Sequence, residues 1–308
     1  MTILDRLSTG WKAWLILFAV TITATAPGVF NLPALDRDES RFAQASKQYI
    51  ETGDYLIIRY QDEFRNKKPA GIHWLQSGAT HLFGDEERLD IWTYRVPSWI
   101  GVGLGTLATF WCGLVFLSRR AAFLGALMFG ATLLVTSEGH ISKTDGVLVF
   151  LTTWGIGALA HLYMGKADNP KRIALIFWFA MGCGLLIKGP VTPMVAAYAG
   201  FGAWIWARAG EGKGGDWWRP LLWWPGPALA AIMFLPWLIA IQFATDGTFL
   251  EGAVGKDLRD KFAGASEGHA GWPLYQISHI PVWFFPAVLL LIPGITLAWK
   301  HLRGSSDV

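Results

Sequence analysis

Two sets of side chains that could do chemistry occur in one charged stretch, residues 35–74, of a chain that is otherwise largely apolar. The first set follows an apolar segment directly and comprises Asp36, Asp38, Glu39 and Arg41, and the second comprises Arg65, Lys67 and Lys68. Carboxylates can take up a proton, and fixed cations can hold a phosphate group. If both sets lie against a membrane, they indicate a site for an anionic, lipid-linked substrate. The alternative interpretation is a solvated charged loop.

The composition indicates an integral membrane protein. Of the 308 residues, 53% are hydrophobic and only 16% are charged, whereas a soluble globular protein carries about 25% charged residues. A membrane-crossing helix needs about 20 consecutive apolar residues, and the chain offers such segments repeatedly. The two cysteines, Cys112 and Cys183, lie inside apolar segments, so they indicate no disulfide framework.

The hydropathy pattern predicts an all-α integral membrane protein, a multi-pass helical bundle of about eight spans. The expected spans are Trp11–Phe30, Trp92–Leu117, Ala121–Thr136, Gly146–Met164, Ile173–Ile187, Val191–Ala207, Leu221–Phe243 and Pro281–Trp299. An even number of spans places both termini on the same side of the membrane.

The charges divide unequally between the two sides of such a bundle. The side that holds the termini carries 12 basic and 5 acidic residues, a net charge of +7. The other side carries 14 basic and 18 acidic residues, a net charge of −4. Basic loops stay in the cytoplasm, so both termini are expected there. The two longest loops, residues 31–91 and 244–280, then lie on the outer, periplasmic side.

Two segments of the first outer loop show helical periodicity and predict short amphipathic helices. Their apolar faces are formed by Phe42, Ala45, Ser46, Tyr49 and Ile50 in the first, and by Ile72, Leu75, Ala79 and Leu82 in the second. Asp38 occupies the position of an N-cap, and Gly53 and Gly84 follow the expected ends. Short amphipathic helices beside a span lie in the headgroup plane. Asp38 and Lys68 would therefore lie at the boundary between water and lipid.

The chain resembles a known family over two blocks of this loop, DRDESRFAQASKQYIETGDYLI and NKKPAGIHWLQSGATHLFG. The family comprises the lipid A 4-amino-4-deoxy-L-arabinose transferases and their dolichyl-phosphate-mannose protein mannosyltransferase relatives. The resemblance continues through ISKTDGVLVF, GLLIKGPV, LPWLIAIQ and GHAGWPLYQ. It implies a single GT-C-like transmembrane domain over residues 1–308, with the active site in the first periplasmic loop. GT-C enzymes transfer a sugar from a polyprenyl phosphate at the outer face of the membrane.

The resemblance assigns catalytic roles to two acids. Asp38, with its neighbour Glu39 in support, matches the acidic pair that follows the first span, and Asp145 matches a second acid, at the start of the fourth span. Each has a structural alternative, because a carboxylate in the first turn of a helix is stabilised by capping and by the helix dipole.

The cations Arg41, Lys68 and Lys188 are the expected ligands of the donor phosphate. Arg41 and Lys68 match family positions, and Lys188 is an ionisable residue at the outer end of a span, which is a functional candidate by default. Either lysine could instead extend to the lipid headgroups. His269 matches a histidine of the second large outer loop, in a supporting role, although a lone histidine there is ordinarily a surface residue.

The sequence departs from the family pattern in two places. Relatives often carry an acid directly before the Lys-Pro pair, and that acid and the loop histidine are candidate metal ligands. This chain has Lys67 there, so we predict no required metal, because His269 alone is a poor site for a divalent ion. The chain also stops after the eighth span, whereas relatives are usually longer, so it is either a compact form or a truncated chain.

The resemblance therefore implies a glycosyltransferase of the bacterial inner membrane that uses a polyprenyl-phosphate sugar and inverts the anomeric carbon. The acceptor stays open between lipid A, another glycolipid, a polysaccharide and a protein hydroxyl. No Gly-rich phosphate loop is present, and no nucleic-acid partner is expected. The main alternative is a transporter or flippase for a lipid-linked or small anionic solute, and a purely structural membrane protein is the other.

Overall fold

The structure is a computed structural model that describes residues 3–34, 36–65, 68–209, 215–252 and 275–304. The α-helices are α1 Ile3–Leu7, α2 Gly10–Asn31, α3 Arg37–Thr52, α4 Gly71–Phe83, α5 Ile91–Phe116, α6 Arg119–Gly130, α7 Leu133–Gly139, α8 Asp145–Tyr163, α9 Pro170–Lys188, α10 Val191–Arg208, α11 Pro225–Ala244, α12 Thr248–Leu250, α14 Tyr275–Trp283 and α15 Leu291–Gly304. Two 3₁₀ turns, η1 Arg219–Leu222 and η3 Ala287–Leu290, and a small hairpin of β1 Arg59–Tyr60 and β2 Glu63–Phe64 complete the elements.

The prediction of an all-α, multi-pass membrane protein is confirmed, but a count of eight spans is not. In the described part of the chain, five helices are long and apolar enough to cross a membrane: α2, α5, α8, α9 and α11. Two further spans are possible only as bent pairs. The pair of α6 and α7 is bent by 57°, and the pair that includes α14 and α15 is bent by 110°. The predicted span Pro281–Trp299 is therefore not one continuous helix.

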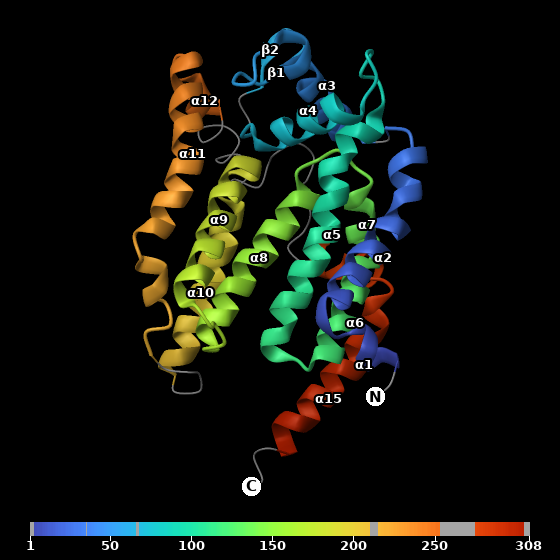
Figure 1. The fold of residues 1–308 in the computed structure, drawn as a ribbon, viewed down its shortest axis with the longest axis vertical. Helices are drawn as coiled ribbons and strands as arrows, with labels where there is room; N and C mark the ends of the chain where they lie inside the picture. The colour runs from blue at the N-terminus through green and yellow to red at the C-terminus, as the bar shows by residue number, and fades with distance from the viewer. Residues whose placement is uncertain (1–2, 35, 66–67, 210–214, 253–274, 305–308) are drawn as a thin grey trace.

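The amphipathic helices α3 and α4, with the β1–β2 hairpin between them, form a layer across one end of the bundle (Figure 1). Helices α1 and α15 lie at the opposite end (Figure 1). The buried face of α3 includes Phe42, Ala45, Ser46 and Tyr49, as its periodicity predicts. Phe42 packs with Val147 of α8 and Ile187 of α9, which anchors the layer to the spans.

The apolar stripe predicted for α4 does not all face the protein. Ile72 and Ala79 are buried, but Leu75 and Leu82 are 47% and 76% exposed. The side of α4 that faces the bundle carries four buried polar residues instead: His73, Gln76, Ser77 and Thr80. Because buried polar groups need hydrogen-bond partners, this face predicts a polar network between α4 and its neighbours.

Helices α5 and α8 approach each other closely at the end of the bundle beneath this layer. A Cβ atom on Gly101 would lie 2.6 Å from the carbonyl oxygen of Gly146, and one on Gly146 would lie 2.6 Å from that of Ser98. The Ser98 hydroxyl also donates a hydrogen bond of 2.9 Å to the Lys143 carbonyl. The first turn of α8, which begins at Asp145, is thereby fixed against α5.

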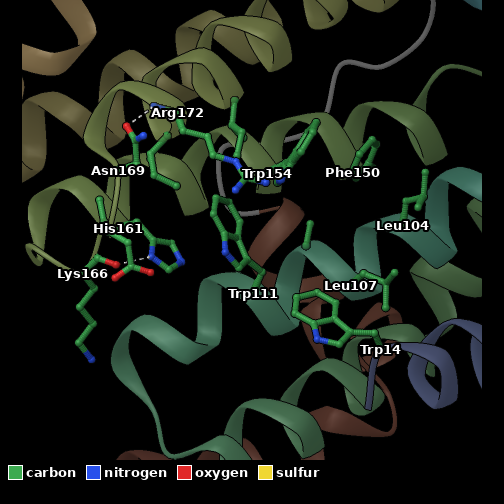
Figure 2. Close-up of a pocket in the computed structure, with 15 residues that line it drawn as sticks. Trp14, Leu104, Leu107, Trp111, Phe150, Trp154, His161, Lys166, Asn169 and Arg172 are labelled. Carbon is green, nitrogen blue, oxygen red and sulfur yellow. Dashed lines mark hydrogen bonds between the residues drawn. The ribbon is translucent and has the colours of Figure 1, made fainter. Parts of the chain in front are cut away.

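The bundle also encloses a groove near its other end, between α2, α5, α8 and α9. Figure 2 shows its lining, with Trp14, Leu107, Trp111 and Trp154 along its length and Arg172 near one end. The groove has a volume of about 590 Å³. Helix α8 has 19 residues and hence a length of about 28 Å, so the polar end of the groove, near His161, lies close to a full helix length from Asp145, while its apolar body extends along α8 to Phe150.

Candidate active site

Helix α3 begins two residues earlier than a cap at Asp38 predicts. Its N-cap is Asp36, whose carboxylate accepts a hydrogen bond of 2.7 Å from the backbone N–H of Asp38. The prediction that Asp38 is the N-cap is therefore wrong, since Asp38 lies in the first turn and Asp36 takes the capping role. Gly53 ends the helix in the left-handed conformation, as predicted. Asp38 is thus not needed for capping.

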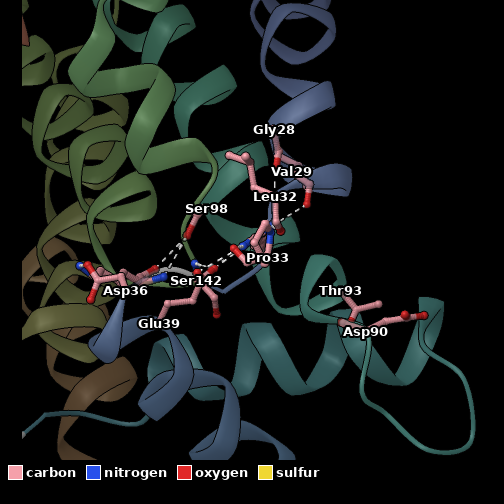
Figure 3. A network of polar contacts seen from close by, with 12 residues as sticks. Gly28, Val29, Leu32, Pro33, Asp36, Glu39, Asp90, Thr93, Ser98 and Ser142 are labelled. Atoms are coloured by element: carbon pink, nitrogen blue, oxygen red, sulfur yellow. Dashed lines mark hydrogen bonds and ion pairs between the residues drawn. The ribbon is translucent and has the colours of Figure 1, made fainter.

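Glu39, adjacent to Asp38, is buried in an ion pair with Arg95 of α5, and both side chains are 1% exposed. The guanidinium donates two hydrogen bonds to the carboxylate, of 2.7 and 3.2 Å. It also donates to the backbone carbonyls of Val29, Leu32 and Pro33 at the end of α2 (Figure 3). Arg95 thereby takes up carbonyls that a helix C-terminus leaves without partners. The pair joins α2, α3 and α5 in one geometry.

A buried hydrogen-bond chain extends from Glu39 across to α4. The Ser142 N–H donates to Glu39 over 3.0 Å, and the Ser142 hydroxyl accepts from the Gln76 amide over 2.8 Å. The Ser46 hydroxyl lies 2.6 Å from the Gln76 amide oxygen and 2.8 Å from Nδ1 of His73. Satisfied networks of this kind make a structure rigid. Together with Glu39 and Arg95, these residues form what we call the inner network.

Two cations lie beside the aromatic residues at the edge of the inner network. Phe42 stacks on His73 with ring centroids 5.4 Å apart. The Arg65 guanidinium lies 4.8 Å, and the Lys68 amine 5.3 Å, from the Phe42 ring centroid. Burial, reinforced by the charges of Arg65 and Lys68, lowers the pKa of His73 to about 3. His73 is therefore neutral at neutral pH, and Lys68 is held next to α3.

Three ion pairs surround the entrance to this region, and we call them the rim. Asp38 pairs with Arg41 over 3.5 Å, Asp36 pairs with Lys143, and Asp145 pairs with Lys188. Unlike Glu39 and Arg95, all six side chains are partly exposed, from 19% for Lys143 to 37% for Asp145. Such pairs contribute little to stability and can exchange partners with a charged ligand.

Lys143 connects the pairs of the rim. Burial lowers the pKa of Lys143, but its hydrogen bond with Asp36 and the charges of Asp36, Glu138 and Asp38 raise it above the ordinary value. Burial likewise raises the pKa of Asp36, and the bonds from Lys143 and the Asp38 N–H lower it below its ordinary value. Both partners are therefore ionised over the physiological range.

Glu138, on α7, adds a further acid near the rim. The charges of Asp145, Lys143, Lys188 and Asp36 all act on it, which places it among the three loops that carry them. Its Oε2 atom is buried, with no hydrogen-bond partner among the residues that the structure describes. Burial raises the pKa of Glu138, so the rim lies beside a buried carboxyl group with one oxygen that has no hydrogen-bond partner among the described residues.

The structure places most of the predicted site residues together. Five of them, Asp38, Arg41, Lys68, Asp145 and Lys188, lie at the end of the bundle that carries α3 and α4. Glu39 is separated from them by burial. Lys67 and His269 lie outside the described residues. Among the residues described, no three His, Cys, Asp or Glu side chains are grouped as metal ligands would be.

Sequence reasoning missed three charged residues of this region. Arg95 lies four residues into a predicted span, and an ionisable group inside an apolar segment was the signal that could have identified it. Lys143 lies two positions before Asp145, which the sequence did predict as a site residue. Glu138 falls between two predicted spans, and nothing in its sequence context distinguishes it from a loop acid.

Comparison with known proteins identifies a family. The model described as dolichyl-phosphate-mannose-protein mannosyltransferase matches residues 67–239, which is more than half of the chain. An undecaprenyl phosphate-alpha-4-amino-4-deoxy-L-arabinose arabinosyl transferase of Aeromonas salmonicida is 29% identical over 218 residues, covering 68% of this chain and 37% of the relative. One of Erwinia tasmaniensis is 24% identical, covering 87% and 47%. The chain thus spans less than half the length of these relatives.

A solved structure shares the fold. The crystal structure of ArnT from Cupriavidus metallidurans bound to undecaprenyl phosphate superposes with a TM-score of 0.74 at 19% sequence identity. The match covers 94% of this chain and 51% of that one. The arrangement of helices is therefore that of a multi-pass membrane glycosyltransferase, over about half of its length.

Proposed function

Because the chain belongs to the dolichyl-phosphate-mannose-protein mannosyltransferase family, we propose that it transfers a sugar from a polyprenyl phosphate to an acceptor hydroxyl or amine at the membrane surface. The observation that carries the proposal is the rim. Asp38, Asp145 and the cations Arg41, Lys68 and Lys188 gather at one end of an apolar bundle. Cations beside an apolar, membrane-embedded surface suit a phosphate on a prenyl chain.

The transfer needs one displacement. The acceptor atom forms a bond to the anomeric carbon while the bond from that carbon to the phosphate oxygen breaks. The acceptor's proton passes to the Asp38 carboxylate, and the polyprenyl phosphate leaves with the bonding electrons. Because the phosphate gains charge as it leaves, Lys68 and Arg41 stabilise the transition state more than the ground state. A single displacement inverts the anomeric carbon.

The rim pairs prepare these residues for the reaction. The Arg41 guanidinium lies 3.5 Å from Asp38 and can turn to a phosphate without leaving a buried charge behind, because both side chains are about one third exposed. Lys188 and Asp145 stand in the same relation at the ends of α9 and α8. Family membership favours this chemistry over the transport of an intact lipid-linked sugar.

The direct test measures bond cleavage. The purified chain would be given a polyprenyl phosphate carrying a labelled sugar, with and without glycolipid acceptors, and released polyprenyl phosphate would be measured by mass spectrometry. We expect release that depends on Asp38 and is unchanged in Asp62→Asn, an exposed acid of the hairpin turn. Movement of the intact donor across vesicle membranes, without cleavage, would contradict transfer and favour a transporter.

We further propose that the α3–α4 end faces the periplasm, and that the termini and the α8–α9 loop face the cytoplasm. The charge division of +7 against −4 supports this orientation. An impermeant thiol reagent should label Asp62→Cys from outside intact cells and should label Asp168→Cys only after lysis. The reverse pattern would contradict the orientation.

A further inference from the structure

The groove between α2, α5, α8 and α9 has the two parts of a lipid site: an apolar body and a cationic end. Its body is lined by aromatic and aliphatic side chains, including Trp14, Leu107, Trp111, Phe150 and Trp154 (Figure 2). A volume of about 590 Å³ is in the range of small-ligand pockets and has room for one extended acyl chain.

The polar end of the groove carries more positive than negative charge. Lys166, Asn169 and Arg172 line it together with a single acid, Asp168. The Lys166 amine donates a hydrogen bond of 2.7 Å to the carbonyl of Val115, which holds this cation at the end of α5. Within the described part of the chain, Arg172 is in no ion pair, and its backbone N–H is capped by the Asn169 amide oxygen over 3.1 Å. Arg172 also lies in the first turn of α9, where the helix dipole favours an anion.

A third group at this end lacks a partner. The His161 ring stacks on Trp111 with centroids 4.5 Å apart, and its Nδ1 lies 3.4 Å from the Lys166 carbonyl. Its Nε2 atom is buried, and none of the described residues gives it a hydrogen bond. A buried polar atom without a partner is costly, and an anionic headgroup could supply one by accepting a hydrogen bond from an Nε2–H.

From these observations we infer that the groove binds one anionic glycerophospholipid of the leaflet at this end of the bundle. One acyl chain lies along Leu107 and Trp111, and the phosphate lies at Arg172, on the polar end that Asn169 and Lys166 also line. The positive charge at the polar end of the groove favours an anionic headgroup, and the aromatic walls favour an acyl chain. The headgroup end of the groove is separate from the rim, because its residues lie at the opposite end of α8 from Asp145, and the inference does not depend on the proposed transfer.

The experiment is a lipid titration of the purified full chain, followed by native mass spectrometry. Phosphatidylglycerol and phosphatidylcholine with identical acyl chains are the two probes. Each cation near a membrane surface contributes about 1 kcal/mol to binding an anionic lipid, which is about fivefold in affinity. Arg172→Gln should therefore weaken phosphatidylglycerol binding about fivefold and phosphatidylcholine binding less, because choline already neutralises that phosphate, so the preference for phosphatidylglycerol should fall.

The matched control is Arg208→Gln. Arg208 is an exposed cation in the last turn of α10, stacked 4.2 Å from the Trp204 ring centroid and outside the groove. The Arg208→Gln variant should bind both lipids as tightly as the unaltered chain does. Equal binding of the two lipids by the unaltered chain, or an equal loss in both variants, would overturn the inference.

Two further arms of the experiment test where the acyl chain binds and which class of lipid occupies the groove. Leu107→Trp narrows the body of the groove, so it should weaken both lipids alike and preserve their ratio, with thermal unfolding checking that the protein stays folded. Polyprenyl phosphate is the competitor in the second arm. If it displaces phosphatidylglycerol from the unaltered chain but not from Arg172→Gln, the groove belongs to the donor's prenyl tail and the phospholipid inference is wrong.

Discussion

Asp38 and Glu39 are adjacent acids on the same helix with opposite surroundings. Glu39 is 1% exposed, pairs in bidentate fashion with Arg95 and accepts a further hydrogen bond from Ser142. Asp38 is 32% exposed and has one ion pair, of 3.5 Å, with Arg41. In the inner network both oxygens of Glu39 accept hydrogen bonds, three in all, whereas the rim leaves more of the lone pairs of Asp38 available.

This difference separates a structural acid from a reactive one. A buried carboxylate that is fully hydrogen-bonded cannot take up a proton without breaking several contacts. A carboxylate at a partly exposed rim can exchange its partner for a substrate at little cost. The inner network therefore holds the first turn of α3 in place, and the rim carries the groups that we propose meet the ligand. Variants of each region should fail in different ways.

The largest effect is expected for Glu39→Gln. The change leaves Arg95 as a buried charge without its counter-ion, which costs about 3–5 kcal/mol of folding free energy. The measurement is thermal unfolding and yield of the purified protein in detergent. The double variant Glu39→Gln/Arg95→Met removes the unpaired charge and should recover part of the loss. Normal stability in Glu39→Gln would show that the inner network does not hold the fold.

Asp38→Asn should have the opposite result: it should lower turnover and leave stability nearly unchanged. Since Asp36 caps the helix, the variant should unfold at nearly the temperature of the unaltered protein. Loss of a positioned acid–base group should lower turnover by about 100-fold or more. Release of polyprenyl phosphate measures the turnover. If turnover stays near normal, Asp38 is a structural residue and the comparison with Glu39 loses its meaning.

Lys68→Ala tests the cation that lies beside Phe42, next to the rim. Loss of a charge-assisted contact costs about 1.5–3 kcal/mol, which corresponds to roughly a 10- to 150-fold weaker use of the donor. Lys68→Arg should restore part of the lost donor use. A metal chelator should have little effect on the unaltered enzyme. Donor titrations of the three proteins measure this. Strong inhibition by the chelator, reversed by a divalent ion, would show that a metal and not Lys68 neutralises the phosphate.

The smallest effect is a dependence of stability on pH, which we expect to arise from His73. Its pKa is about 3 in the folded protein and 6.5 in the unfolded chain, so the unfolded chain binds the extra proton between these values. Stability should therefore fall as the pH falls below 6.5, by about 2 kcal/mol from pH 7.5 to pH 5. His73→Asn keeps an acceptor near Ser46 and should lose this dependence.

The rim should not contribute to that pH dependence. The pKa of Asp36 lies below its ordinary value of 3.8 in the folded protein, so its pair with Lys143 persists above that pH and is lost only in stronger acid. Denaturant unfolding at several pH values, for the unaltered protein and His73→Asn, measures the difference. Equal slopes for both proteins would show that His73 is not the titrating group.

The sequence alone determined the class of protein and a set of candidate site residues along the chain. Long apolar segments can only be buried in lipid or in a bundle, which indicated the membrane class and singled out Lys188 at the end of a span. The resemblance to a known family pointed to Asp38, Lys68 and Asp145. The periodicity of α3 also identified its buried face, because one face of a helix repeats every three to four residues.

The tertiary structure decided which of these charges meet, and which of two adjacent acids is free to react. Asp38 and Glu39 differ by one position, about 100° around the helix, and only the location of α5 determines that Arg95 reaches Glu39. The groups of the rim come from segments separated by over one hundred residues, such as Asp36 and Lys143, and no local pattern records that pairing. Local periodicity reports the faces of single helices, whereas contacts between charges depend on how the helices pack.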